Sequence, residues 1–167
     1  MSGSARVLAR SAPFRRVVGA RFVSNLGNGI APIAMAFGVL DLPGATPTSL
    51  SIVLAAQAIP LVLLLPIGGV VADRWGRARV LGASDVILSL FMFAMSALFL
   101  TGTATVPALA ALMAVYGCLA AAWYPAMTGL VPDVVSDEHL QSANAFVSVA
   151  NNSGFVIGSA VGGVLVA

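Results

Sequence analysis

The sequence has 167 residues, of which 59% are apolar and 8% are charged. A soluble domain carries about 25% charged residues, so this composition excludes a globular protein with a water-exposed surface. The eight basic residues are all arginine, and the formal net charge of +2 by itself points to no class of partner. The single cysteine, Cys118, lies in an apolar run, which excludes a disulfide framework and a cysteine-pair metal site.

Five apolar stretches are long enough to cross a bilayer as helices: residues 17–40, 50–72, 80–100, 106–128 and 143–167. A hydrocarbon core about 30 Å thick needs roughly 20 helical residues, because a helix satisfies its own backbone groups inside lipid. The connections at 41–49 and 101–105 are short and contain helix breakers, so neighbouring helices should be antiparallel. We therefore predict an all-α integral membrane protein, with one bundle over residues 17–167 and an arginine-rich tail over residues 1–16.

The arginines predict how the chain is oriented. They precede or begin the first span, or lie between the second and third spans: Arg6, Arg10, Arg15, Arg16, Arg21, Arg74, Arg77 and Arg79. The loops at 41–49 and 101–105 contain none, and this asymmetry predicts a plasma membrane protein with a cytoplasmic amino terminus. Before the last span, Ser136 is expected to cap a helix whose first turn holds Asp137 and Glu138.

The most specific motif lies between the second and third spans. The run Gly69-Val-Val-Ala-Asp73-Arg74-Trp75-Gly76-Arg77-Ala78-Arg79 puts one acid beside three arginines at a membrane edge. Arginine and tryptophan are common anchors at such an edge, but anchoring leaves the acid unexplained. We interpret the run as a charge cluster with exchangeable pairs that can hold a bundle in one of two states, with Gly69 allowing close helix approach.

This run resembles the loop signature of the major facilitator superfamily of secondary transporters, Gly-x-x-x-Asp-Arg-x-Gly-Arg-(Arg/Lys)-(Arg/Lys), which lies between the second and third helices. The matching residues are Gly69, Asp73, Arg74, Gly76, Arg77 and Arg79, while Ala78 stands where a second basic residue is usual. The resemblance implies a conformational-switch loop that steadies one end state of alternating access through contacts with a carboxy-terminal half.

The last span resembles the antiporter signature of the same family, Gly-x-x-x-Gly-Pro-x-x-Gly-Gly. Its matching residues are Gly154, Gly158, Gly162 and Gly163, and Ser159 takes the place of the proline. The resemblance implies export by antiport. The residues alone predict a seam for close helix packing, which is compatible with that role.

Shorter runs, among them Arg21-Phe-Val-Ser-Asn-Leu-Gly27 and Leu140-Gln-Ser-Ala-Asn-Ala145, resemble the branch that includes macrolide and siderophore exporters. Many such exporters carry an acid at the position of Asn28 and an arginine near Leu88, and Met113 stands where drug antiporters have an arginine. Protons are the coupling ion that the resemblance implies, and these departures leave coupling through this half open.

Several polar residues fall inside the spans, where a charge costs about 2.5 to 3.5 kcal/mol. Arg21 and Asp85 lie at similar depths, roughly 6 to 8 Å from the cytoplasmic edge, and are predicted to form an ion pair. Trp123 is interpreted as an aromatic of the membrane interface. Five uncharged residues are predicted to line a cavity, although each could instead bond a neighbouring helix: Asn25, Asn28, Gln57, Tyr116 and Asn151.

The second and last spans contain a short internal sequence similarity, which we call the echo. Ile67-Gly-Gly-Val-Val-Ala resembles Val161-Gly-Gly-Val-Leu-Val, and the move from position 67 to 161 is an offset of 94. The two spans are expected to run in opposite directions, as an inverted three-helix repeat requires. The offset puts a sixth helix near position 174, so we expect a bundle truncated before that helix.

These observations predict the incomplete amino-terminal part of a secondary transporter that exports small amphipathic molecules or drugs. The expected partners are the lipid bilayer, a small-molecule substrate, protons and the missing carboxy-terminal half. No enzyme activity, cofactor, metal or nucleic acid is expected, because the sequence has no nucleotide loop or metal-ligand cluster. One alternative is a small non-transporting subunit that packs through its glycine seams. Another is a self-sufficient oligomeric multidrug transporter, which usually carries a mid-membrane acid that this chain lacks.

Overall fold

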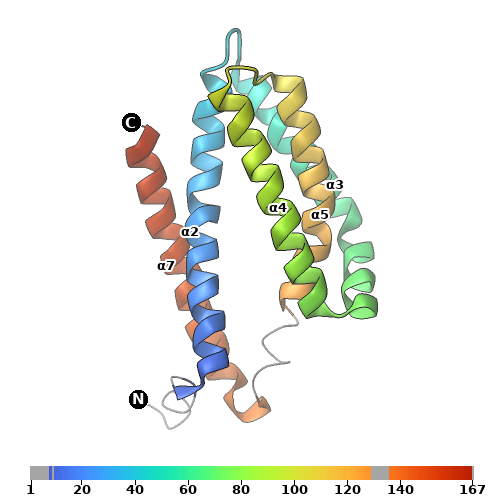
Figure 1. Cartoon of the computed structure of the whole chain (residues 1–167), viewed down its shortest axis with the longest axis vertical. Helices are drawn as coiled ribbons and strands as arrows, with labels where there is room; N and C mark the ends of the chain where they lie inside the picture. Colours follow the sequence, from blue (N-terminus) through green and yellow to red (C-terminus); the bar gives the residue numbers. More distant parts are fainter. Residues whose placement is uncertain (1–7, 9, 129–135, 167) are drawn as a thin grey trace. The chain divides into compact units, whose positions relative to one another are not determined.

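The computed structural model describes residue 8, residues 10–128 and residues 136–166 (Figure 1). Its long helices are each long and apolar enough to cross a membrane: α2 (Ala12–Leu40), α3 (Pro47–Trp75), α4 (Arg77–Leu100), α5 (Val106–Thr128) and α7 (Leu140–Val166). The described residues contain no strand. The predicted all-α class with five membrane helices is therefore confirmed.

Local sequence signals explain where α3 begins. Thr46 caps the helix, because its hydroxyl accepts a hydrogen bond from the amide of Ser49, while the Ser49 hydroxyl accepts one from the amide of Thr46. Pro47 follows at the first helical position, where its missing N–H costs no hydrogen bond. This reciprocal cap starts the helix three residues before the predicted span.

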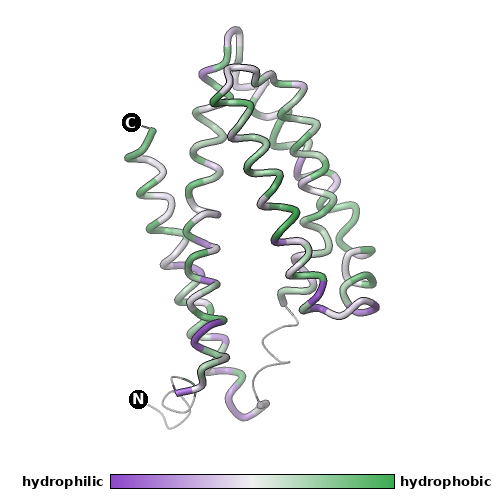
Figure 2. Tube along the Cα trace, viewed as in Figure 1, coloured by the Kyte–Doolittle hydropathy of each residue, from purple (hydrophilic) through white to green (hydrophobic). Residues whose placement is uncertain are grey.

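The turn from α3 to α4 is a single residue, Gly76, with φ of +89°. Its amide still donates to the carbonyl of Ala72 at 3.1 Å, and the next helix begins at once with Arg77. Both helices thus run three residues beyond the predicted spans, because a helix can carry charged side chains once it leaves the hydrocarbon. Figure 2 shows this turn as a hydrophilic stretch between two apolar helices.

The chain forms two compact units. The first unit comprises Met1–Phe37 and Val131–Ala167, so it holds most of α2 together with α7. The two helices lie side by side (Figure 1). At one end of the pair a small apolar cluster is formed by Leu8, Phe14, Ala143 and Val147.

The second unit comprises Gly38–Leu130, with α3, α4 and α5. Helix α5 packs along α3 and also against α4. Near the Gly76 turn these three helices share an apolar cluster formed by Ala72, Val80, Leu81 and Ala126. The residues on both sides of the turn therefore pack into this buried apolar cluster.

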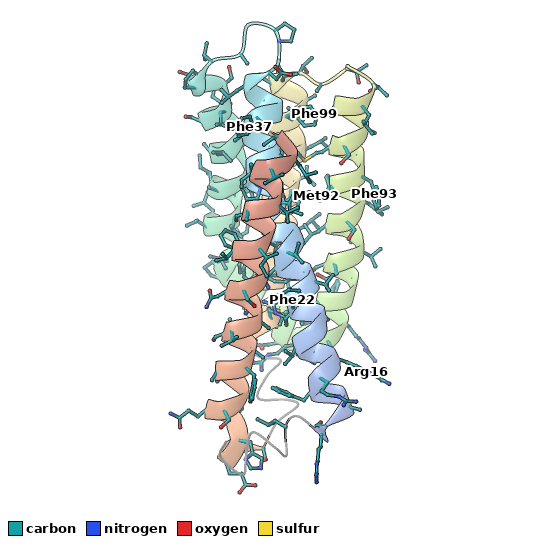
Figure 3. All side chains as sticks on the ribbon, turned by 90° about the vertical axis from the view of Figure 1, so that its left-hand side faces the viewer. Arg16, Phe22, Phe37, Met92, Phe93 and Phe99 are labelled. Carbon is teal, nitrogen blue, oxygen red and sulfur yellow. The ribbon has the colours of Figure 1, made fainter. Side chains whose placement is uncertain are left out.

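Many large apolar side chains remain outside these clusters. Phe93 on α4 is 74% exposed and points away from its helix (Figure 3). Leu63 on α3 and Val164 on α7 are similarly exposed. Apolar exposure on this scale suits a lipid environment, where no hydrophobic penalty attaches to it.

The predicted start of the last helix differs from the structure. A short 3₁₀ helix, η1 (Asp137–His139), precedes α7, and the carbonyl of Ser136 accepts a hydrogen bond from the amide of His139 at 2.9 Å. This i to i+3 bond is the 3₁₀ pattern, which commonly tightens a helix start. The α-helix therefore begins at Leu140, after the acidic residues.

Candidate functional site

The charge cluster between α3 and α4 has one ion pair at its centre. Asp73 in the last turn of α3 accepts from Arg77 in the first turn of α4, with Oδ1 at 3.1 Å from one terminal nitrogen and 3.3 Å from Nε. The side chains are 67% and 37% exposed, respectively. An exposed pair at this spacing contributes about 0.5 kcal/mol or less, so it can be exchanged at little cost.

The other members of the motif surround this pair. Arg74 and Arg79 are exposed on the two sides of the turn, and Gly76 makes the turn. Gly69 lies about two helical turns before Gly76, and a methyl group added there would meet Pro125 only at ordinary contact distance, 3.9 Å. The structure thus brings the predicted charged residues together, while the close helix approach lies elsewhere.

That close approach is made by Gly68 and Gly117 on the α3·α5 contact. A methyl group at Gly68 would overlap the carbonyl oxygen of Ala121, and one at Gly117 would overlap the carbonyl oxygen of Gln57. Both positions therefore require glycine for backbone contact. Sequence reasoning singled out neither glycine, although Gly68 belongs to the echoed Gly-Gly pair.

The glycine seam of α7 faces α2. A methyl group at Gly154 would lie 2.5 Å from the carbonyl oxygen of Phe22, one at Gly158 would overlap that of Leu26, and one at Gly162 would lie 3.2 Å from the Cα atom of Ile30. Gly163 has no atom within 4 Å of such a group, so it lies off the seam. The seam is therefore built from glycines spaced four residues apart.

Helix α2 contributes a glycine of its own to this seam. A methyl group at Gly29 would overlap the carbonyl oxygen of Phe155, so both backbones approach closely here. The hydroxyl of Ser159, which replaces the signature proline, donates to the carbonyl of Gly29 at 3.4 Å. Serine at this position thus adds an interhelical hydrogen bond.

Two of the predicted cavity-lining amides pair with each other. The side-chain nitrogen of Asn25 donates to the side-chain oxygen of Asn151 at 2.9 Å and also to the carbonyl of Arg21 at 2.9 Å. Both amides are half-buried between α2 and α7. This contact favours the interpretation in which amides bond a neighbouring helix.

The other three candidates are placed differently. Gln57 and Tyr116 are half-buried at one level of the α3·α5 contact, where Gly117 touches the backbone of Gln57. Asn28 is exposed on α2. The five amides and hydroxyls thus divide between the two units, and a shared cavity stays a prediction.

Asp85 has a partner that sequence reasoning missed. Its Oδ1 accepts a hydrogen bond of 2.6 Å from the indole nitrogen of Trp123 on α5, and the indole ring packs edge-on against Tyr124 at 5.3 Å. Trp123 therefore joins α5 to α4 by a hydrogen bond, in addition to the interfacial position expected from the sequence. Arg21 belongs to the first unit and Asp85 to the second, so their pairing stays a prediction.

Within the described residues, no group of three or more His, Cys, Asp or Glu side chains could hold a metal ion. The site consists of an exposed charge cluster at one helix turn and of tight glycine contacts along two helix pairs.

Comparison with known proteins agrees with this arrangement. An uncharacterized MFS-type transporter of Bacillus subtilis, YfiS, is 26% identical over 145 residues, which cover 87% of this chain and 34% of the relative. The quinolone resistance protein NorA of Staphylococcus aureus strain MRSA252 is 31% identical over 146 residues, 85% of this chain and 35% of the relative. No solved structure matches significantly.

The chain spans about a third of the length of these relatives. Neither name refers to macrolide or siderophore export, so that branch stays a prediction. The sequence model of the Major Facilitator Superfamily matches residues 17–167, which begin inside α2 and include the whole of α3, α4, α5 and α7. The chain therefore belongs to the major facilitator superfamily.

Proposed function

We propose that the chain is the amino-terminal part of a secondary active exporter, which moves small amphipathic molecules or drugs by alternating access and antiport. Membership of the family supports transport, and the name of the relative NorA, a quinolone resistance protein, supports efflux. We propose an inner-membrane location with the amino terminus in the cytoplasm, because the arginines gather at one end of the spans.

The observation that carries the proposal is the ion pair at the Gly76 turn. A switch needs a contact that holds one state without locking it, and a coupling of a few kcal/mol is enough to shift such an equilibrium. The pair between Asp73 and Arg77 is exposed, so its carboxylate can change partner during a transport cycle. In our proposal the carboxy-terminal half supplies the second partner.

The alternative of a non-transporting subunit has less support. That function would use the glycine seam of α7 to bind another protein. Gly154, Gly158 and Gly162 instead contact α2 of the same chain, so the seam is already occupied. Assembly through it would first have to separate two packed helices.

The experiment is export from cells or everted vesicles that contain the whole gene product, with a quinolone and an amphipathic dye as probes. We expect export that stops when an uncoupler collapses the proton gradient, and no export by the 167-residue chain alone. Secondary export would be contradicted if the probes accumulate as they do with empty membranes and if the uncoupler does not change that accumulation.

The matched variants are Asp73→Asn and Asp41→Asn, which remove one carboxylate from each of two exposed positions. We expect Asp73→Asn to abolish most of the export while changing the free energy of unfolding by less than about 0.5 kcal/mol. Asp41→Asn should retain export, because Asp41 lies in the loop after α2. Equal export by both variants would refute the switch role of Asp73.

A further inference from the structure

We propose that the turn between α3 and α4 binds the phosphate headgroup of an anionic phospholipid. The site is a pocket lined by Arg74, Trp75, Arg79, Val80 and Ala83. This lipid site does not depend on the transport activity proposed above, and its test measures lipid rather than export.

The pocket is formed by both helices that meet at Gly76. Arg74 and Trp75 come from the last turn of α3, and the other three residues come from the first two turns of α4. Its volume is about 430 Å³, which is within the range of small-molecule sites. Because Gly76 turns the chain in a single residue, one arginine from each helix lines the same pocket.

The charges of the pocket suit a phosphate. The carboxylate of Asp73 is engaged by Arg77, which is not a lining residue. Over the part of the chain that the structure describes, no ion pair includes Arg74 or Arg79. Two guanidinium groups without a carboxylate can each present a planar fork of donors to phosphate oxygens.

The remaining walls suit a lipid better than a free ion. Val80 is 7% exposed and belongs to the apolar cluster near the Gly76 turn, and Ala83 adds a small apolar surface to the pocket. Trp75 is 68% exposed at the end of an apolar helix, where tryptophan usually lies at headgroup level. A headgroup with its glycerol and first acyl carbons would contact both the basic and the apolar walls, whereas inorganic phosphate would use only the arginines.

The test measures phosphatidylglycerol that stays bound to the 167-residue chain. The chain is reconstituted in phosphatidylcholine nanodiscs that contain phosphatidylglycerol, released into detergent, and analysed by native mass spectrometry. The variant R74Q/R79Q removes both pocket charges. The control R15Q/R16Q removes two exposed arginines from the beginning of α2, and Figure 3 shows Arg16 there.

We expect R74Q/R79Q to weaken retention of phosphatidylglycerol by about tenfold or more, because each lost bond is to a charged group. The control should weaken it by less than about threefold, the effect of a general surface charge. The variant R74K/R79K should lie between them, since lysine keeps the charge but loses the fork. Equal losses in R74Q/R79Q and R15Q/R16Q would overturn the proposal.

Two further arms separate the lipid from free phosphate and from a folding defect. Excess inorganic phosphate should leave the bound phosphatidylglycerol in place, and its displacement would mean that the site takes phosphate alone. Ala83→Phe fills the pocket without changing charge, and Ala94→Phe places the same ring elsewhere on the exposed surface of α4. Retention should fall only for Ala83→Phe, and equal retention by both would refute a site in this pocket.

Discussion

Two side-chain hydrogen bonds join neighbouring apolar helices of this protein. The side-chain amide of Asn25 on α2 donates a hydrogen bond to that of Asn151 on α7, and the indole of Trp123 on α5 donates one to Asp85 on α4. Lipid cannot satisfy such groups, so each finds its partner on a neighbouring helix. Asn25, Asn151, Trp123 and Asp85 therefore join neighbouring helices, and any role in transport builds on that contact.

The bond between Trp123 and Asp85 gives a prediction at this scale. Trp123→Phe keeps the aromatic volume but removes the only donor of the side chain. We expect the free energy of unfolding to fall by about 1 kcal/mol, which is less than the roughly 1.5 to 3 kcal/mol of a buried bond to a charged group, because Asp85 is exposed. Thermal unfolding followed by circular dichroism should show a midpoint about 2 to 4 °C lower.

The matched control for that variant is Trp75→Phe, which changes the other tryptophan of the chain at a 68% exposed position. This control should unfold at the temperature of the unmodified protein. If both variants shift the midpoint equally, the hydrogen bond to Asp85 contributes nothing that is specific to its geometry.

At the scale of elements, the two helix pairs use one packing device. In α2·α7 the seam is Gly154, Gly158 and Gly162, and in α3·α5 it includes Gly68 and Gly117. Gly68 and Gly162 are separated by the offset of 94, and both are buried against a partner helix. The sequence echo thus corresponds to equivalent packing: each echoed helix uses its glycine to approach another backbone.

The seam of α7 offers a prediction with opposite signs at neighbouring glycines. Alanine favours a helix over glycine by about 1 kcal/mol. Gly163→Ala should therefore stabilise the protein, because no atom lies within 4 Å of the added methyl group. Gly158→Ala should instead destabilise it by about 1 to 3 kcal/mol, because the methyl group would overlap the backbone of Leu26.

Thermal unfolding of the two alanine variants in the same detergent checks this prediction. A disulfide between cysteines placed at facing positions along the edge of the α2·α7 contact reports separately whether the pair stays together. If Gly158→Ala is as stable as Gly163→Ala, the close approach of α2 and α7 at Leu26 is wrong.

The elements themselves are well encoded in the sequence. All five long helices follow from apolar runs, and the Gly76 turn follows from a glycine between charged residues. The partners of each helix do not follow from the sequence in this simple way. Gly68 and Gly69 are the same residue type, and they differ only in which face of α3 they occupy. For the same reason the sequence alone indicates only an interfacial aromatic at Trp123, because its indole nitrogen meets Asp85 only after α4 and α5 pack.

At the scale of the whole molecule, apolar surface outside the clusters and charge at the helix ends together imply a bilayer. Exposed side chains such as Leu63 and Phe93 occupy the middle of their helices, while Asp73 and its arginines occupy the Gly76 turn. The chain belongs to the major facilitator superfamily and covers about a third of the length of its relatives. The Gly76 turn joins two of its membrane helices, so we expect the turn on one side of the membrane. That placement makes the orientation testable with single cysteines.

The orientation prediction uses one position at the beginning of α3 and one just after its end, in the first turn of α4. Thr48 and Ala78 are both exposed, and about 42 Å of helix separates position 47 from position 75. The native Cys118 is first replaced by serine, and Thr48→Cys or Ala78→Cys then supplies the only thiol. Because arginines favour the cytoplasmic side, a membrane-impermeant maleimide should label position 48 in intact cells and position 78 only in everted vesicles. The reverse pattern would place the charge cluster outside the cell and remove the basis for a cytoplasmic switch, whereas labelling of both positions in sealed intact cells would mean that α3 does not cross the membrane.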